Sequence, residues 1–291
     1  MRLVLLTSLT MVAFAANSVL NRMALAGGSI DATSFAALRL ASGAVALAVL
    51  CHVLRGAIAL RGPGRVTGVL SLLVYLYGFS TAYDALDAGM GALILFGVVQ
   101  ITMFAGGLIA AEPTPPRRWT GAAVAFAGLA WLLWPGSGPD VSARHGLLMS
   151  LAGLGWGVYS LVGRNNGDPL QATAANFILA TPPGIALAFL LPAGPAGMHA
   201  SGEGILWAVI SGVVMSGMGY ALWYRVLPGL PSSVAAVAQL TVPVIATAGG
   251  ILFLSETLTL PFVIASGVVL GGVAIAVLPL GRCLTRFSSG S

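Results

Sequence analysis

The sequence predicts an all-α membrane protein with ten transmembrane helices, arranged as two inverted five-helix repeats around a central cavity. Three observations lead to this prediction: the composition, a series of apolar runs, and an internal repeat. Hydrophobic residues make up 58% of the chain and charged residues only 7%, whereas a soluble domain carries about 25% charged residues. The composition therefore indicates a protein that lies in a lipid bilayer.

The apolar runs number ten, and each is long enough to form one membrane-crossing helix. Such a helix needs about 20 mostly apolar residues. Charged residues, proline and glycine separate the runs. They cover residues 3–24, 33–54, 66–86, 89–110, 117–134, 146–163, 171–191, 204–225, 232–254 and 260–280. Because the connections between them are short, no soluble domain is expected.

The first run also resembles a secretory signal. Arg2, an apolar stretch and the small residues "AFA" (Ala13–Ala15) follow one another, as they do before a signal cleavage site. However, the apolar stretch continues to Ala26, and the repeat described below gives this run a partner. We therefore expect it to be retained as the first helix.

The placement of arginine predicts the orientation. All thirteen basic residues are arginine, and they are scattered singly, so the net charge of +5 does not indicate a nucleic-acid-binding face. With a cytoplasmic N-terminus, ten arginines fall on the cytoplasmic side and only Arg22 and Arg144 on the other. The positive-inside rule then predicts an inner-membrane protein with both termini in the cytoplasm. Cys51 and Cys283 would face that reducing side, where disulfides are rare.

Two apolar runs end on a glutamate in the same way, "GGLIAAEP" (Gly106–Pro113) with Glu112 and "GILFLSET" (Gly250–Thr257) with Glu256. A shift of 144 residues superposes these glutamates, and it also places Gly128 on Gly272. Shifts of 142 and 141 place "FAANSVLNR" on "WGVYSLVGR" and "GFSTAYDAL" on "GYALWYRVL". The charged and aromatic matches, kept in order, predict a repeat of five helices.

Five is an odd number, so the second repeat must enter the membrane from the opposite side. This inverted arrangement recurs in secondary transporters, with the substrate held near the midplane. We expect a first repeat at residues 1–135, a second at 145–281 and a cytoplasmic tail at 282–291, whose last residues resemble a tag remnant. Glu112 and Glu256 then lie on opposite faces. Each charge is expected to stabilise the N-terminus of the helix that follows it, with a gating role as the alternative.

The ten runs, the "W-G…R" that opens the second repeat and the "L-x-x-x-E" that ends the fourth and ninth runs resemble the EamA family of the drug/metabolite transporter superfamily. Within that family the chain looks most similar to amino-acid exporters of the YddG type. The resemblance implies a cavity lined by helices 1, 3, 4, 6, 8 and 9. Two positions depart from the repeat: Phe14-Ala15 is matched to Trp156-Gly157, and Val99 to Pro243.

Ionisable residues are nearly absent from the middle of the runs. An intramembrane protease would need a nucleophile with its catalytic partner at that depth, and a proton antiporter would use a buried acid. No metal or nucleotide motif is present, so no cofactor is expected. Arg39 is the exception, two turns into the second run. We expect it to snorkel outward or to pair with Asp31, Asp84 or Asp87, with a substrate carboxylate as the alternative partner.

Aromatic and amide side chains provide the candidate substrate-binding residues. Trp156 and Tyr159 share a helix face because of their three-residue spacing. Gln100 and Gln239 should face the bundle interior, since an unpaired amide is costly in lipid. The candidates are Asn17, Tyr77, Gln100, Trp156, Tyr159, Tyr220 and Gln239. Three aromatic residues near the run ends are expected in the interfacial belt: Tyr83, Trp223 and Tyr224.

A second set of residues is expected at the mouths or gates of the cavity: Arg39, Asp84, Asp87, Glu112, Pro243 and Glu256. Pro243 and the Gly249-Gly250 pair mark a helix that can bend. Two pairs of small residues, Gly153-x-x-x-Gly157 and Gly267-x-x-x-Gly271, predict close contacts between helices.

These features predict a transporter rather than an enzyme. Aromatic faces and amides suit a zwitterion with an apolar part, whereas a nucleotide sugar would need several basic residues at depth. We expect a facilitator that exports amino acids such as phenylalanine, methionine or threonine, or related small metabolites, by alternating access; the direction rests on the resemblance. Its partners would be this solute and the lipid bilayer, with no nucleic acid. A proton-coupled broad-specificity drug/metabolite exporter is the alternative. A receptor or scaffold, which needs no polar cavity, is the third.

Overall fold

The computed structural model describes residues 2–111, 115–134, 142–163, 167–194, 196–226, 229–230 and 238–277. Within these ranges the regular structure is helical, and the β pairing is limited to an isolated bridge between Ile30 and Ala200. Glu112 lies outside the described residues, so the structure does not bear on its predicted role.

Every predicted apolar run overlaps a helix, which confirms the all-α class. The helices are α1 (Arg2–Ala26), α2 (Ala32–Arg55), α3 (Arg65–Ala82), α4 (Ala88–Ile109), α5 (Pro116–Leu133), α6 (Ala143–Gly163), α7 (Pro169–Leu190), α8 (Gly202–Ile210), the π-helix η1 (Ser211–Met218), α9 (Gly219–Val226), α11 (Thr241–Leu254) and α12 (Leu260–Val277). The segments α8, η1 and α9 follow one another without a break. Among the described residues six helices, with α8–α9 as one, are long and apolar enough to cross a membrane.

Polar side chains fix the starts of several helices. Asp31 accepts a hydrogen bond from the Ser34 amide at 2.9 Å at the start of α2. Asp168 and Ser201 cap α7 and α8 in the same way. Each side chain satisfies an amide that the first helical turn leaves unpaired. These caps place the charged residues at the helix ends and leave the helix middles apolar.

The outward faces of the helices are apolar, as a lipid environment requires. On α2, Val45, Val49 and Val53 repeat every four residues and are 65%, 59% and 73% exposed. Such a stripe would be unfavourable in water but is normal against lipid, where backbone groups are paired within the helix. Together with the six long apolar helices, it identifies a multi-pass membrane protein.

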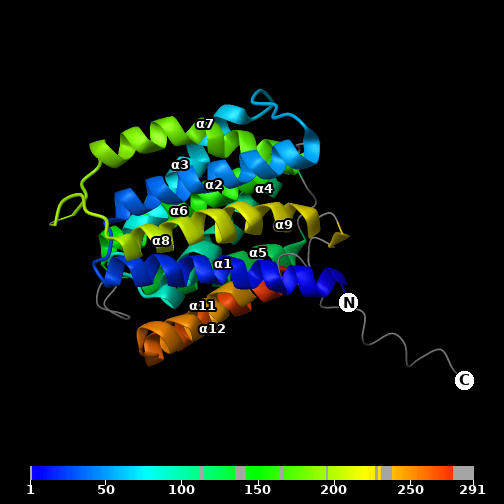
Figure 1. Ribbon diagram of the computed structural model, residues 1–291. Helices are drawn as coiled ribbons and strands as arrows, with labels where there is room; N and C mark the ends of the chain where they lie inside the picture. Colours follow the sequence, from blue (N-terminus) through cyan, green and yellow to red (C-terminus); the bar gives the residue numbers. More distant parts are fainter. Residues whose placement is uncertain are drawn as a thin grey trace, which may run out of the picture.

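The helices run side by side, with α1 and α8–α9 adjacent and with α11 and α12 along one edge of the bundle (Figure 1). α2 packs against α7, α5 against α12, and α6 against both α3 and α4. Gly153 and Gly157 allow the α6–α4 contact, as predicted, because an added Cβ would lie 2.8 Å from the Leu95 carbonyl and 2.6 Å from Thr102.

The second glycine prediction is wrong. A Cβ at Gly267 or Gly271 would meet nothing within 4 Å. The close contact of α12 with α5 is made one residue further along, by Gly272 and by Gly121 on α5. Spacing alone could not identify the buried face, because glycines lie on several sides of α12.

Loops that were predicted on the same side of the membrane lie together. At one end, here called the outer end, Arg22 contacts Asp87 and Glu256, and Asp31 accepts from the His199 amide. The opposite end, the inner end, joins other loops, with Arg55 on Asp168 at 2.6 Å and Arg65 on Asn176 at 2.9 Å. The alternating direction of the predicted runs agrees with these pairings.

Candidate functional site

A central cavity lies between five segments of the bundle, and α11, the ninth helix of the predicted series, supplies none of its lining residues. Its lining is aromatic with one amide: Phe14 and Asn17 on α1, Tyr75 and Phe79 on α3, Leu95 and Phe96 on α4, Trp156 on α6, and Tyr220 on α9. Its open volume is about 10 Å³, close to the least that holds one water molecule. The described residues therefore hold the cavity nearly closed.

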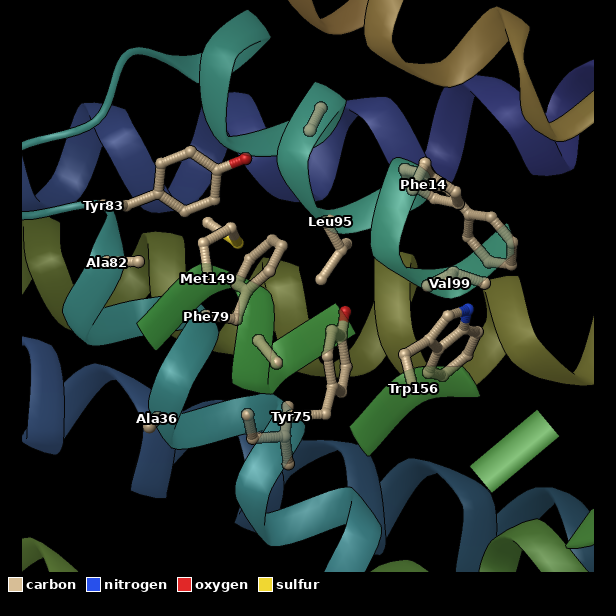
Figure 2. Packing of buried hydrophobic residues seen from close by; sticks show 14 of the residues in the cluster. Phe14, Ala36, Tyr75, Phe79, Ala82, Tyr83, Leu95, Val99, Met149 and Trp156 are labelled. Carbon is tan, nitrogen blue, oxygen red and sulfur yellow. The ribbon is translucent and has the colours of Figure 1, made fainter. Parts of the chain in front are cut away.

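Trp156 is the centre of the aromatic cluster. Its ring lies 4.7 Å from that of Tyr220, 5.0 Å from Tyr75 and 6.0 Å, edge to face, from Phe14. Tyr159 stacks on it at 5.6 Å. Figure 2 shows Tyr75 between Phe79 and Trp156, with Phe14 above Trp156. Rings at these distances attract one another by about 0.5–1.5 kcal/mol per pair beyond burial.

Arg39 lies beside this cluster and is fully buried, so the prediction that it snorkels or pairs with an aspartate is wrong. Its guanidinium donates from Nε to Ser216 at 2.9 Å and from Nη2 to the hydroxyls of Tyr75 at 2.9 Å and Tyr220 at 3.4 Å. It also lies 4.9 Å from the centre of the Phe79 ring. The reason is tertiary: α2 packs against α7, α8 and η1, and the guanidinium is held between η1 and α3 by Ser216 and Tyr75.

The π-helix η1 supplies two serines to this polar network, Ser216 to Arg39 and Ser211 to Asn17. Ser211 donates to Asn17 at 2.5 Å, and Asn17 donates to Ser216 at 3.4 Å. Wider turns of this kind occur often at functional sites, and here the five-residue spacing turns both serines inward. Ser211 and Ser216 were not among the residues predicted from the sequence. Their five-residue spacing in "SGVVMS" was the one feature that could have indicated them.

The structure brings three of the seven candidate binding residues to the cavity wall: Asn17, Trp156 and Tyr220. Tyr159 adjoins them through Trp156, and its buried hydroxyl has no hydrogen-bond partner among the described residues. Tyr77 points elsewhere and donates to the Gly184 carbonyl of α7. Gln100 and Gln239 are half-buried and do not line the cavity.

Two of the three residues expected in the aromatic belt are buried. Tyr83 is fully buried and Trp223 is 5% exposed, whereas belt residues face the lipid surface. Tyr83 donates to the Ala88 carbonyl and packs against Phe79, and Trp223 packs against Phe14. Tyr224 is half-buried. Both buried rings extend the aromatic cluster instead of marking the membrane surface.

At the outer end, Glu256 caps α4 rather than the helix that follows it, which corrects the sequence-based expectation. Both carboxylate oxygens accept from the Ala88 amide at 3.0 Å, and Arg22 lies 3.6 Å away. Arg22 also donates to the carbonyls of Tyr83 and Asp84 at 3.0 and 3.1 Å. These contacts join α1, the α3–α4 turn and the segment after α11. The sequence reasoning had used Arg22 only as a marker of orientation.

Burial governs the charge of the acids at this end. It raises the pKa of Glu256, as does the charge of Asp87, while the Ala88 amide and Arg22 oppose the shift. The pKa of Asp84 is also raised, first by burial and then by Asp31. Asp87 and Glu256 line a second cavity of about 50 Å³, with Thr247 and Phe262 on its wall. Two acids at the outer end, Asp84 and Glu256, therefore have raised pKa values.

Pro243 lies in the first turn of α11, whose N-cap is Leu240. Ala238 and Gln239 are also helical, so the helical run is interrupted at Leu240, and Pro243 follows directly after this interruption. The predicted bending role of Pro243 stays a prediction. The described ranges hold no group of three or more His, Cys, Asp or Glu residues able to bind a metal ion.

Comparisons with known proteins agree with the membrane architecture. The uncharacterized protein PA1977 of Pseudomonas aeruginosa is 47% identical over 284 residues, which cover 97% of this chain and 96% of that protein. A solved structure, described only as the crystal structure of a protein, has a TM-score of 0.63 at 18% identity and covers 92% of this chain and 96% of its own. That likeness shows a shared fold. The EamA-like transporter family matches residues 145–278. The chain therefore carries a domain of the EamA-like transporter family at residues 145–278.

Proposed function

We propose that the protein is an inner-membrane secondary transporter that exports neutral amino acids, such as phenylalanine, methionine or threonine, or closely related metabolites. The observation that carries the proposal is the aromatic cavity around Trp156, which has Asn17 as an amide on its wall. Aromatic faces attract both an apolar side chain and an ammonium group. The family supplies the transport function, and the YddG type, which the sequence resembles, supplies export.

We further propose that the chain is two inverted five-helix repeats. The pairings support this, because α2 packs on α7, α4 on α11 and α5 on α12, each helix on its equivalent in the other repeat. In addition, α3 packs on α6, and their equivalents in the other repeat, α8–α9 and α1, pack on each other in the same way. The cavity wall takes side chains from both proposed repeats, Phe14 and Tyr75 from one, Trp156 and Tyr220 from the other.

Alternating access follows from this arrangement. A cavity of about 10 Å³ cannot hold an amino acid, so transport requires the helices to separate. At the outer end, Arg22, Asp87 and Glu256 would part when the cavity opens outward. We assign these residues, with Asp84, to the outer gate; Glu112 remains a candidate for the inner gate.

Flux through proteoliposomes tests the function. Vesicles loaded with radiolabelled phenylalanine, methionine or threonine should release it faster than empty-lipid controls, without an imposed pH difference. Trp156→Ala should lower the rate at least about tenfold, since it removes the centre of the cavity. Ala substitution of Trp134, which lies at the end of α5, is the matched control. Absence of flux for all three amino acids would overturn the amino-acid assignment.

A proton-coupled exporter is the second candidate, and the raised pKa values of Asp84 and Glu256 favour it. In that case flux would appear only with a pH difference, and neutral substitution of Asp84 or Asp87 would abolish the driven component. In a facilitator, the same substitutions would change only the rate of flux and would not abolish it.

A further inference from the structure

We infer that Arg39 is the anchor for a carboxylate in the central cavity, so that the solute is a small carboxylate with an apolar group. This inference rests on the proposed transport function of the same cavity. Arg39 is fully buried, and its Nη1 has no hydrogen-bond partner among the described residues. A guanidinium carries five N–H donors, and the three hydrogen bonds to Ser216, Tyr75 and Tyr220 use only Nε and Nη2.

Within the part of the chain that the structure describes, no acid forms an ion pair with Arg39. Its acceptors are the neutral hydroxyls of Ser216, Tyr75 and Tyr220. The nearby acids are engaged at the outer end: Asp31 with the amides of Ser34 and His199, Glu256 with Ala88 and Arg22. Burying an ion costs several kcal/mol unless an opposite charge is supplied. Rings at 4.9 and 5.3 Å from the guanidinium offset part of this cost.

The geometry connects this charge to the cavity. Tyr75 and Tyr220 line the cavity and also accept from Arg39, and their hydroxyls are 3.1 Å apart. They form the boundary between the guanidinium and the open space. A carboxylate that enters the cavity can accept hydrogen bonds from these hydroxyls and, as they move apart, from Nη1.

The rest of the wall determines what the carboxylate carries. Phe14, Trp156 and Phe79 surround the open space with ring faces and edges. They suit an aromatic or large aliphatic group. The remaining polar group on the wall is Asn17, which already bonds to Ser211 and to Ser216, the serine that also accepts from Arg39. We therefore expect the carboxylate to be essential for binding and an ammonium group to be secondary.

A series of phenylalanine analogues separates these requirements in the unmodified protein. We would measure the thermal stability of the purified protein, and inhibition of phenylalanine counterflow, with phenylalanine, 3-phenylpropionate, phenethylamine and phenylalaninamide. A ligand of the native state raises the Tm. Phenylalanine and 3-phenylpropionate should raise it, and the two compounds without a carboxylate should need at least about tenfold higher concentrations. Equal potency of phenethylamine and 3-phenylpropionate would overturn the inference.

Variants provide the second measurement. Arg39→Gln should remove the preference for carboxylates while Arg39→Lys retains part of it, and the exposed Arg144→Gln is the matched control. A folded Arg39→Gln protein that still prefers 3-phenylpropionate to phenethylamine would also overturn the inference. If the variant does not fold, the analogue series decides alone.

The same experiments separate this inference from the proposed function. If amino acids are transported but carboxylate-free analogues compete equally, transport stands and the Arg39 site fails. If 3-phenylpropionate raises the Tm while no amino acid moves, the carboxylate site stands and the amino-acid assignment fails. If no compound binds or moves, the inference is overturned together with that assignment.

Discussion

We expect protonation of Glu256 to be coupled to closure of the outer end. Burial raises its pKa while it contacts Ala88 and Arg22. Opening would return its carboxyl to water and to an ordinary pKa of about 4.3. The closed arrangement therefore binds the proton more tightly, and a fall in pH from neutral toward that range stabilises it.

We accordingly predict that flux falls as the pH is lowered equally on both sides of a proteoliposome membrane. Glu256→Gln should give a low rate that no longer depends on this transition, because the uncharged side chain mimics the protonated acid. The control is Glu203→Gln, an exposed acid in the first turn of α8 that accepts from Trp207 Nε1 at 3.2 Å and is not part of the gate. An unchanged pH profile in Glu256→Gln would contradict the prediction.

Individual residues also show what the sequence could and could not predict. The sequence identified Arg39 as the one charge deep within an apolar run, and Asn17, Trp156 and Tyr220 as candidates for a cavity. It could not predict the partners of Arg39, which lie 36, 177 and 181 residues away. Hydropathy records how deep a residue is along its helix, whereas the direction of its side chain depends on the neighbouring helices.

At the scale of elements, helix boundaries were predictable because charges, prolines and glycines mark the ends of apolar runs. Helix faces were not. The hydrophobic pattern of α12 is nearly uniform around the helix, so nothing in it distinguished Gly272, which contacts α5, from Gly271, which contacts nothing. The π-helix η1 was also not predictable from composition. Its wider helical period, and not its residue types, turns Ser211 and Ser216 toward Asn17.

The contact between α5 and α12 gives a prediction at this scale. A methyl group at Gly272 would lie 2.5 Å from the Ala125 amide nitrogen and 2.8 Å from the Gly121 carbonyl, and backbone atoms cannot yield as flexible side chains do. We expect Gly272→Ala to destabilise the protein by about 1–3 kcal/mol, the usual cost of overpacking, and to lower its Tm in detergent or lipid.

Gly271→Ala is the matched control, because its methyl group would meet nothing within 4 Å and alanine is the better helix former. Its Tm should equal or exceed that of the unmodified protein. A similar loss of stability in both variants would show that the α5–α12 contact is not the cause.

At the scale of the whole molecule, the contacts at the two ends constrain the path of the chain. Arg22, Asp87 and Glu256 meet at the outer end, while Arg55 and Asp168 meet at the inner end. These groupings require successive helices to run in alternating directions. The same alternation is expected from the short connections between the apolar runs. It holds whichever end of the bundle faces the cytoplasm. The orientation rests on a separate physical argument, the retention of arginine-rich loops on the cytoplasmic side.

Two exposed glycines offer a direct measurement of that orientation. Gly167 lies at the inner end and Gly202 at the outer end, and neither has an atom within 4 Å of an added Cβ. In a protein with Cys51→Ser and Cys283→Ser, a membrane-impermeant maleimide should label Gly202→Cys in intact cells or spheroplasts. It should label Gly167→Cys only after the membrane is broken. The reverse result would invert the topology, and would place the arginine-rich end, with Arg55 and Arg65, outside. Labelling of both sites in intact cells would contradict the separation of the two ends by a bilayer, because Gly167 and Gly202 are joined by α7, one of the long apolar helices.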